Sequence, residues 1–382
     1  MKGLLNYRKE LPGKDNVMKK LNVAIFFGGC SSEYGVSLES ASAVINSMNR
    51  ERYVPVPVGI TREGKWFYFS GDTEKIKDDT WCNPQDCVPA VLSPEREEHK
   101  LLIMKDGRVD FIRIDAVFPV LHGKNGEDGT IQGLIELAGI PLVGCGVLAS
   151  AVCMDKDRAH RLAQAAGIRV PRAVVLESGM RSTGKDGFLM ANEIEILLRR
   201  AADFACEIGY PLYVKPVKAG SSYGVTRVRK PEELPAAVSL AFQYDNQVIV
   251  EENIEGFEVG CAVMGNEILT VGEVDEIELS GGFFDFTEKY TLKTSAIHVP
   301  ARISSEKAEE IRETGKIIYK ALGCSGFARV DMFLTPAGDI VFNEVNTIPG
   351  FTEHSRFPGM MKAAGYSFAE ILENIIGLAV GL

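Results

Sequence analysis

A strand, a glycine turn and a helix follow one another near the start of the chain, and this order constrains the fold most. Residues 21–27 form a run that is apolar apart from Asn22, two glycines follow it, and a helical pattern begins near Ser37. A continuous apolar run bounded by turn residues is typical of a strand buried on both faces of a parallel sheet. A second unit repeats the order, with a strand at 115–121, the turn HGKNGEDG and a helix at 130–138. The sequence therefore predicts an α/β domain at the N-terminus.

Antiparallel strands and isolated helices are predicted for the rest of the chain. Residues 61–112 contain both tryptophans and several prolines, and are expected to be an inserted excursion of short strands. A predicted helix carrying residues 154–158 begins the next portion, and the length of 382 residues argues for two or three domains. The fold class is thus α/β plus α+β. The predicted parts are a flexible extension at 1–17, an α/β domain at 18–144, and two α+β portions at 145–255 and 256–382, with strands at 212–216, 224–228 and 248–252 and helices at 305–322 and 367–378.

The charge and the cysteines exclude several classes of partner. A formal net charge of −10 argues against duplex nucleic acid, which requires a basic surface. No apolar run approaches the roughly 18 residues of a membrane span, so no membrane partner is expected. The eight cysteines form no paired Cys-x-x-Cys motifs. They predict a reduced, cytoplasmic protein with free thiols, in which every cysteine is a small core residue.

A predicted hairpin near the C-terminus places charged side chains on one face. The strands FARVDMFL and IVFNEVN are joined by TPAGD, and residues two apart on a strand share a face. With a two-residue turn, Asp331 lies opposite Glu344 and Arg329 lies opposite Asn346. Two carboxylates and an amide then converge beside a cation, a set that suits Mg²⁺ when phosphates supply further ligands. From spacing alone, an exposed salt-bridged hairpin face is an equally good interpretation.

A second candidate is the segment KPVKAGSSYG, which begins at Lys215 and lies between two predicted strands. Its glycines allow close approach of the backbone to a ligand, and its serines offer hydroxyl donors. It lacks the Gly-Lys-Ser/Thr ending of a strand-to-helix phosphate loop. In isolation it is better explained as a long hairpin loop, but Lys215 favours an anion beneath it.

Glu33 and His122 follow the two N-terminal strands, at the edge where open α/β sheets bind ligands. Each by itself is more often an ordinary loop residue, and their occurrence at corresponding turns modestly favours a site. The segment GGCSSE does not match the Gly-x-Gly-x-x-Gly pattern, so a dinucleotide oxidoreductase is poorly supported.

Taken in order, these segments resemble the D-alanine–D-alanine ligase family of ATP-grasp enzymes, from about residue 20 to 380. The motifs are GGCSSEYGVSLESA, VFPVLHGKNGEDGTIQG, MDKDRA, KPVKAGSSYG, EKY, ARVDMF and NEVNTIPGFTEHSRFP. The resemblance implies an ATP-grasp fold with an N-terminal Rossmann-like domain, and a homodimer. It implies that ATP and two Mg²⁺ ions (or Mn²⁺) convert D-alanine into an acylphosphate, which the amine of a second D-amino acid then attacks.

The resemblance also implies roles for individual residues. A lid loop at 280–299 would exclude water. The ATP residues would be Lys156, Lys215 and Lys289 at the phosphates, with Ser222, Glu251, Glu258, Ile254 and Phe283 around the nucleotide. Asp331, Glu344 and Asn346 would hold the metal ions. Glu33, Ser221 and Tyr290 would form a hydrogen-bonded triad, His122 would lie near the first substrate's carboxylate, and Arg329 and the Gly350 N–H would form an oxyanion site.

Arg356, directly after Ser355, indicates the second substrate. Housekeeping members of the family usually have Leu or Met there, and the vancomycin-resistance ligases share the arginine. With Phe284 and the retained Tyr290, the chain is similar to the D-alanine–D-serine ligases of VanG type. An apolar wall would leave a serine hydroxyl unpaired at a cost of ~1–3 kcal/mol, which is roughly one to two decades of discrimination.

Other functions remain open from the sequence. If Arg356 points to solvent, a housekeeping ligase with D-alanine as second substrate is expected. Another ATP-grasp ligase, such as a carboxylase or a peptide-tagging enzyme, is disfavoured by Glu33 and by EKY. A catalytically silent nucleotide-binding sensor would show damage in the hairpin residues, and these are intact.

Overall fold

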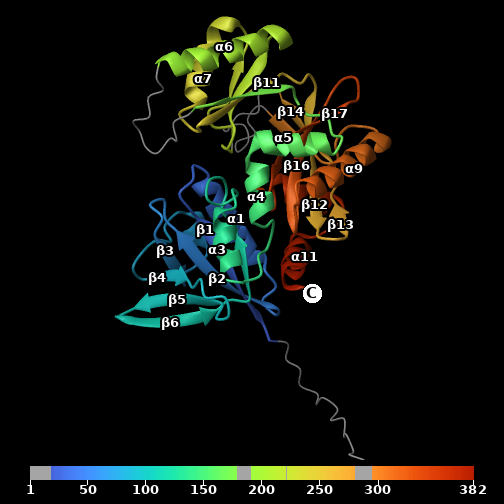
Figure 1. Ribbon diagram of the computed structural model, residues 1–382. Helices are drawn as coiled ribbons and strands as arrows, with labels where there is room; N and C mark the ends of the chain where they lie inside the picture. The colour runs from blue at the N-terminus through green and yellow to red at the C-terminus, as the bar shows by residue number, and fades with distance from the viewer. Residues whose placement is uncertain (1–18, 179–190, 221, 280–294) are drawn as a thin grey trace, which may run out of the picture.

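The computed structural model describes residues 19–178, 191–220, 222–279 and 295–382, arranged around three β-sheets (Figure 1). In spatial order, the N-terminal sheet contains β6 (Arg108–Arg113), β5 (Lys100–Lys105), β4 (Cys87–Leu92), β3 (Trp66–Phe69), β2 (Tyr53–Ile60), β1 (Leu21–Gly28) and β7 (Ala116–Pro119). β1 is parallel to both β2 and β7, as the buried apolar runs predict. The inserted excursion extends this sheet with antiparallel strands. Its helices are α1 (Tyr34–Ser47), α2 (Glu74–Lys77) and α3 (Thr130–Leu137).

The central sheet is wholly antiparallel, in the order β10 (Thr226–Val228), β9 (Leu212–Pro216), β11 (Gln247–Glu252) and β8 (Ala173–Glu177). Helices α6 (Ala191–Ile208) and α7 (Leu234–Ala241) pack on it, and a 3₁₀ turn, η1 (Pro231–Glu233), precedes α7. Two helices, α4 (Val147–Met154) and α5 (Lys156–Ala165), lead into this part. The single helix predicted through residues 154–158 is therefore wrong, because Asp155 has an extended backbone between them.

The C-terminal sheet follows the order β15 (Ser295–His298), β14 (Asp275–Leu279), β12 (Phe257–Gly265), β16 (Phe327–Leu334) and β17 (Ile340–Asn346), with β13 (Leu269–Val271) paired to β12. The last residues of the expected lid loop, 295–298, thus belong to a sheet strand. Helices α9 (Ser305–Ala321), α10 (Arg356–Ala363) and α11 (Phe368–Val380) complete this part. The domain boundaries near residues 144 and 255 stay predictions, and each falls in a connection between two sheets.

The β16–β17 hairpin has the predicted pairing at its functional end but a different turn. Asp331 lies opposite Glu344 and Arg329 opposite Asn346. Thr335 and Asp339 bracket a three-residue loop rather than a two-residue turn. Gly338 in this loop has a φ of 86°, a left-handed conformation that glycine adopts readily. A β-bulge between Asp331 and Met332 then shifts the pairing by one residue, which restores the predicted partners.

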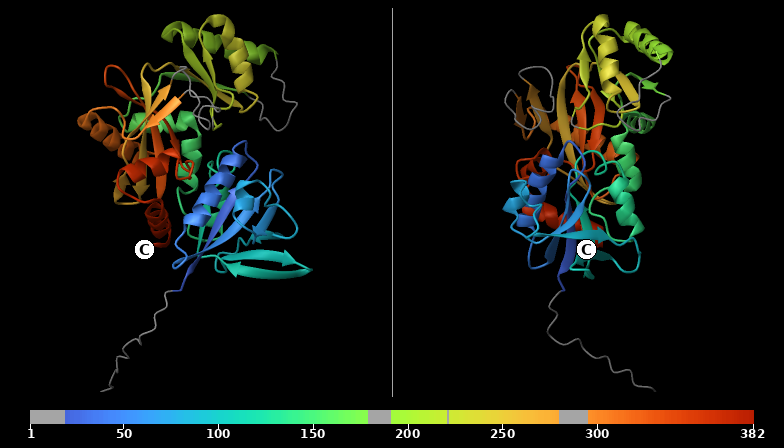
Figure 2. Two further views of the ribbon diagram at one scale, coloured as in Figure 1. Left: turned by 180° about the vertical axis from the view of Figure 1, so that it is seen from behind. Right: turned by 90° about the vertical axis from the view of Figure 1, so that its left-hand side faces the viewer.

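The N-terminal and C-terminal sheets share one apolar core, whereas the central sheet has its own. Phe118 from β7, Phe327 from β16 and Phe351 pack edge to face, with ring centroids 5.4 to 5.9 Å apart. The core of the central sheet contains only residues from 174 to 250. Figure 2 shows the central sheet and its helices at the end of the molecule opposite the N-terminal sheet. Two bodies of unequal size therefore face each other.

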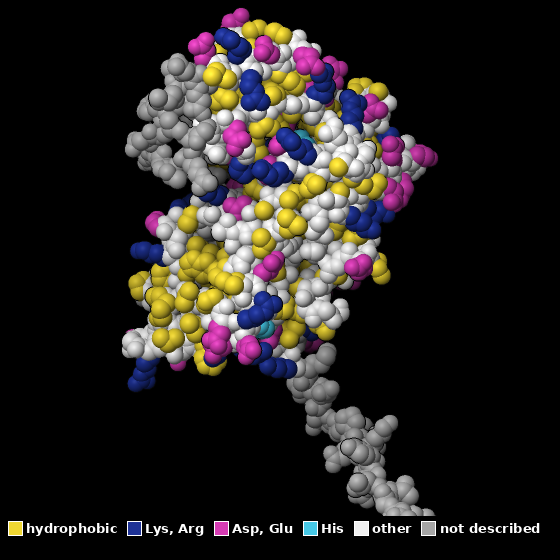
Figure 3. Space-filling view, viewed as in Figure 1, with side chains coloured by type: hydrophobic (Ala, Val, Ile, Leu, Met, Phe, Trp, Pro, Cys, Tyr) yellow, Lys and Arg dark blue, Asp and Glu magenta, His cyan; other side chains and the backbone are white. Residues whose placement is uncertain are grey.

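Surface features complete the fold. All eight cysteines are free, as predicted, but Cys30, Cys82 and Cys206 are exposed, so the prediction that every cysteine fills the core is wrong. Apolar side chains gather over β4 to β6 (Figure 3), where Val109 and Phe111 are exposed on the edge strand. Within the described ranges, no single helix is long and apolar enough to span a membrane; α10 and α11 meet that test only as a pair, bent by 104°.

Candidate active site

Two pockets meet between the sheets. The first, of about 370 Å³, is lined by residues of the N-terminal and C-terminal parts, among them Glu33, His122 and Arg329. The second, of about 600 Å³, lies between the central and C-terminal sheets. Lys156, Ala219 and Glu344 line both pockets. A ligand in the larger pocket can therefore present one end to a ligand in the smaller pocket at these three residues.

The break between α4 and α5 positions Lys156. Asp155 is the N-cap of α5, and its side chain accepts a hydrogen bond from the Arg158 N–H at 3.0 Å. This cap satisfies one of the free N–H groups at the helix start. Lys156 is then the first residue of the helix, and its Nζ donates to the Ala219 carbonyl at 2.8 Å. The predicted phosphate lysine is thus held where the two pockets meet.

The larger pocket contains a buried ion pair. Lys215 Nζ lies 2.5 Å from Glu251 Oε2; the Glu251 side chain is 2% exposed and the Lys215 side chain 14% exposed. Burial alone would lower the pKa of Lys215 and raise the pKa of Glu251, but their mutual attraction outweighs burial and shifts both pKa values in the charged direction. Tyr213, Ile254, Phe257 and Phe333 supply apolar wall, and Ser222 and Glu258 supply polar wall. An apolar slot with a few polar groups suits a nucleotide base and ribose.

The hairpin face at the junction carries the predicted metal residues. Arg329 donates to both oxygens of Asp331, and Asn346 Nδ2 donates to Asp331 Oδ2 at 2.9 Å. Glu344 lies opposite Asp331 in the ladder, so both side chains share one face. This oxygen donor set fits Mg²⁺ when a phosphate contributes ligands. Within the described residues, no group of three or more His, Cys, Asp or Glu is arranged to hold a metal ion, so the protein alone would not complete a coordination shell.

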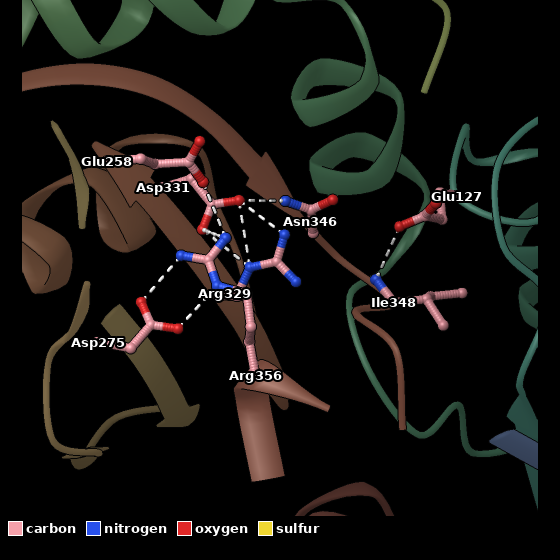
Figure 4. Close-up of polar contacts among 8 residues, drawn as sticks. All are labelled: Glu127, Glu258, Asp275, Arg329, Asp331, Asn346, Ile348 and Arg356. Carbon is pink, nitrogen blue, oxygen red and sulfur yellow. Dashed lines mark hydrogen bonds and ion pairs between the residues drawn. The ribbon is translucent and has the colours of Figure 1, made fainter. Parts of the chain in front are cut away.

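Arg356 is held by carboxylates at the wall of the smaller pocket (Figure 4). Its Nε and Nη2 donate to the two oxygens of Asp275 at 2.7 and 2.8 Å, and its Nη1 donates to Glu258 at 2.8 Å. The same Nη1 lies 3.4 Å from Asp331 Oδ1. Burial alone would lower the pKa of Arg356, but Asp275 and Asp331 outweigh it and keep the pKa high. Only 8% of the side chain is exposed, so the alternative in which Arg356 points to solvent is wrong.

Glu33 is reached by glycines from two parts of the chain. A Cβ at Gly123 would lie 2.2 Å from Glu33 Oε2, and a Cβ at Gly220 would lie 3.1 Å from the same atom. Gly123 also has a φ of 73°. Gly220 belongs to the predicted Gly/Ser loop of the central part. Both backbone segments can therefore approach the Glu33 carboxylate because each has a glycine, without a side chain, at the point of contact.

His122 and Glu127 are buried and line the smaller pocket together with Glu33. His122 Nδ1 lies 2.8 Å from the Ile348 carbonyl, and His122 Nε2 lies 3.2 Å from Ser40 Oγ. Burial lowers the pKa of His122, so the ring is neutral and its proton is on Nδ1, facing the carbonyl. Burial and, next, the charge of Glu33 raise the pKa of Glu127 to about 8. His122 therefore already uses both ring nitrogens in contacts within the protein.

The outcome differs among the predicted site residues. Gly350, Ser355 and the predicted residues described above line the pockets, except Asp331, whose side chain is 1% exposed and lines neither. Ser355 Oγ accepts from the Thr352 N–H at 3.0 Å. Sequence reasoning missed Asp275, which is fully buried. The acids that alternate with apolar residues in VGEVDEI (271–277) were the available signal, since a buried acid requires a cation. Five predicted site residues lie outside the described residues: Ser221, Phe283, Phe284, Lys289 and Tyr290.

Known proteins match this chain along nearly its whole length. The D-ala D-ala ligase N-terminus family matches residues 22–145, and the D-ala D-ala ligase C-terminus family matches residues 162–377. The crystal structure of VanG D-Ala:D-Ser ligase from Enterococcus faecalis is 53% identical, with a TM-score of 0.84, over 95% of this chain and 100% of that chain. The vancomycin B-type resistance protein VanB of Enterococcus faecalis is 44% identical, over 95% and 99% of the two chains. A D-alanine–D-alanine ligase of Caldicellulosiruptor bescii is 42% identical, over 95% and 96%.

Two connected pockets on this fold, together with these matches, define an ATP-dependent ligase of the ATP-grasp class. Such an enzyme uses a nucleotide and a divalent metal ion, and its substrates are small amino acids. The chain belongs to the D-alanine–D-alanine ligase family, within which its relatives include vancomycin-resistance proteins.

Proposed function

We propose that this enzyme joins D-alanine to D-serine and so makes a peptidoglycan precursor of the vancomycin-resistance type. The observation that carries the proposal is the buried Arg356–Asp275 pair, of which Arg356 lines the smaller pocket and Asp275 lies beneath it. A charged pair makes this wall polar where an aliphatic residue would make it apolar. A polar wall suits a hydroxymethyl group, since an unpaired buried hydroxyl costs about 1–3 kcal/mol. The likeness to the VanG D-Ala:D-Ser ligase supports the same choice.

In the proposed reaction, the carboxylate of D-alanine attacks the γ-phosphorus of ATP and ADP leaves. The amine of D-serine then attacks the acyl carbon, and phosphate leaves from the tetrahedral intermediate. Lys156 and Lys215 bind the phosphates as fixed cations, and Glu33 pairs with the ammonium group of D-alanine. Arg329 and the Gly350 N–H stabilise the oxyanion that forms at the acyl carbon.

Asp331, Glu344 and Asn346 are proposed to hold two Mg²⁺ ions, which would neutralise the charge on the transferring phosphoryl group. Arg329 contacts Asp331 directly, so a cation already faces this carboxylate. Glu251, Glu258 and Ile254 are proposed to contact the adenosine part of ATP from the wall of the larger pocket. The homodimer stays a prediction, and light scattering of the purified protein tests it.

A product assay tests the choice of second substrate. The enzyme is supplied with MgATP, D-alanine and an equal concentration of D-serine, and the dipeptides are separated by chromatography. We expect D-Ala–D-Ser in at least tenfold excess. A tenfold or greater excess of D-Ala–D-Ala would contradict the proposal and favour the housekeeping function, which the relative from Caldicellulosiruptor bescii makes the second candidate. A parallel arm with D-lactate tests depsipeptide formation.

A further inference from the structure

The segment 347–351 of the C-terminal part is fastened to the N-terminal part through both peptide groups of Ile348. The Ile348 N–H donates to Glu127 Oε1 at 3.2 Å, and the Ile348 carbonyl accepts from His122 Nδ1 at 2.8 Å. The other oxygen of Glu127 accepts from the Gly123 N–H at 2.7 Å. Glu127 and His122 are both buried. One residue of the C-terminal part is thus fixed in position and in orientation by two N-terminal side chains.

The other end of the segment, at Phe351, is also hydrogen-bonded to the N-terminal part. The Phe351 N–H donates to Ser40 Oγ at 3.1 Å, and Ser40 lies on α1 with no exposed surface. Because His122 Nδ1 is a donor, Nε2 is an acceptor, so Ser40 donates its own hydroxyl proton to His122 at 3.2 Å. The Phe351 ring is buried against Phe118 and Phe327. The direction of each hydrogen bond in this chain of contacts, from donor to acceptor, is therefore defined.

Gly350 lies between these two anchors. Pro349 precedes it, and the proline ring fixes φ and restricts the backbone of Ile348 as well. Gly350 lines the smaller pocket. In the part of the chain that the structure describes, the Gly350 N–H has no hydrogen-bond acceptor. The anchors therefore hold the backbone of a residue whose free N–H is available to a ligand.

We propose that Glu127, His122 and Ser40 are positioning residues that aim the Gly350 N–H at the tetrahedral centre. The inference rests on the proposed role of Gly350 as an oxyanion donor. Hydrogen-bond donors stabilise an oxyanion only when they are already oriented toward the place where charge develops. His122 then acts through the main chain of Ile348, in contrast to the substrate contact that the sequence predicts. The N-terminal part, which carries Glu33 for the first substrate, also sets the geometry at the acyl carbon.

Two variants test the proposal. Ser40→Ala removes one anchor with the loss of a single oxygen. Glu127→Gln replaces one oxygen, which can accept a hydrogen bond in either protonation state, by an amide nitrogen that only donates, and this nitrogen opposes either Gly123 N–H or Ile348 N–H. The matched control is Glu136→Gln, because Glu136 Oε1 also accepts a backbone N–H, from Val147 at 2.8 Å, but lies outside both pockets. Each enzyme is assayed for phosphate release with the pair of D-amino acids that the wild type prefers, so failure of the D-serine assignment leaves this test intact.

We expect kcat of both variants to fall at least tenfold while KM for ATP changes less than twofold. Binding of a phosphinate analogue of the tetrahedral adduct should weaken at least tenfold, because the analogue uses the aimed N–H. The control should stay within twofold of wild type in all three quantities. Retention of kcat and of phosphinate binding within twofold in Ser40→Ala would overturn the proposal. An equal rise of KM for ATP in both variants would also overturn it, since that indicates general loss of structure.

Discussion

The side chain of Arg356 carries a buried charge that contacts residues at both pockets. Arg356 contacts Glu258 in the wall of the larger pocket, Asp331 on the hairpin and Asp275 beneath the smaller pocket. A buried arginine with several carboxylates is stable only as a set, because removal of one member leaves uncompensated charge. The polarity of the pocket wall and the stability of the protein thus depend on the same side chain.

Substitution Arg356→Leu should change both specificity and stability. The preference for D-serine over D-alanine should fall at least tenfold, measured as the ratio of kcat/KM values for the second substrate. The unfolding free energy should fall by about 3–5 kcal/mol, because Asp275 keeps a buried charge without its partner. Arg302→Leu is the control: Arg302 pairs with the neighbouring Glu276 but is 52% exposed, so a loss of about 0–1 kcal/mol is expected. Unchanged specificity in a folded Arg356→Leu enzyme would contradict the prediction.

Glu127 should make stability depend on pH. Its pKa is about 8 in the folded protein and near 4.5 in the unfolded chain, so the folded state binds the extra proton between these values. Stability is therefore highest below pH 4.5 for this group and falls as pH rises toward 8, by at most about 1.4 kcal/mol per pH unit. Glu127→Gln should remove this part of the slope. Urea unfolding of the wild type and of Glu127→Gln is measured at pH 5.5 and 8.5. The difference between the two proteins separates the contribution of Glu127 to the pH dependence from those of its charged neighbours Glu33 and Arg329.

The extended residue between α4 and α5 shows how an element boundary creates a site. Asp155 ends one helix and caps the next, so Lys156 occupies the first turn, where the helix dipole also favours an anion. A continuous helix through this segment would place no helix N-terminus at Lys156. The phosphate site therefore depends on the break.

Removal of this cap should raise KM for ATP. Asp155→Ala should cost about 1 kcal/mol of stability, as for other N-caps, and raise KM for ATP at least fivefold as Lys156 becomes less ordered. Ser304→Ala removes the cap of α9, where Ser304 Oγ accepts from the Lys307 N–H at 3.2 Å, and Ser304 lines neither pocket. It should cost about the same stability and leave KM within twofold. Equal KM values for the two variants would show that the break has no role in nucleotide binding.

At the scale of the whole molecule, a small central body faces a larger body made of the other two parts (Figure 2). The larger pocket lies between them and is lined by residues of both. A nucleotide in this pocket contacts two separately packed cores. Its binding should therefore stabilise the arrangement of the bodies as well as each body.

MgATP should stabilise the protein through this pocket. At a concentration 100 times its Kd, it should add about 2.7 kcal/mol to the unfolding free energy, seen as a higher melting temperature. Lys215→Ala should remove most of this increment. Lys218→Ala is a matched control three residues away, because Lys218 pairs with Asp245 and lines neither pocket. An increment that survives in Lys215→Ala would place the nucleotide elsewhere.

Local patterns were sufficient for several strands, for helices α1, α3, α9 and α11, and for the family, but they did not predict β8, α6, α7 or α10. Apolar runs and the period of two identify β1, β9 and the hairpin strands, because burial and side-chain alternation depend on adjacent residues. The partners on the hairpin are correct for a reason that the sequence did not contain: a longer turn and a bulge offset each other. The break at Asp155 was missed because helix propensity there is ordinary and the cap is a single side chain.

The sequence by itself determined the class of enzyme, because each motif is a short local segment. The order of these segments along the chain can be read without any interatomic distance. Tertiary structure alone decided what those residues contact. It turned Arg356 inward onto Asp275 and joined Ser40, His122 and Glu127 to segment 347–351, more than 200 residues away. Such pairs cannot be predicted from local periodicity, because burial of charge and hydrogen-bond direction are fixed only when separate elements pack together.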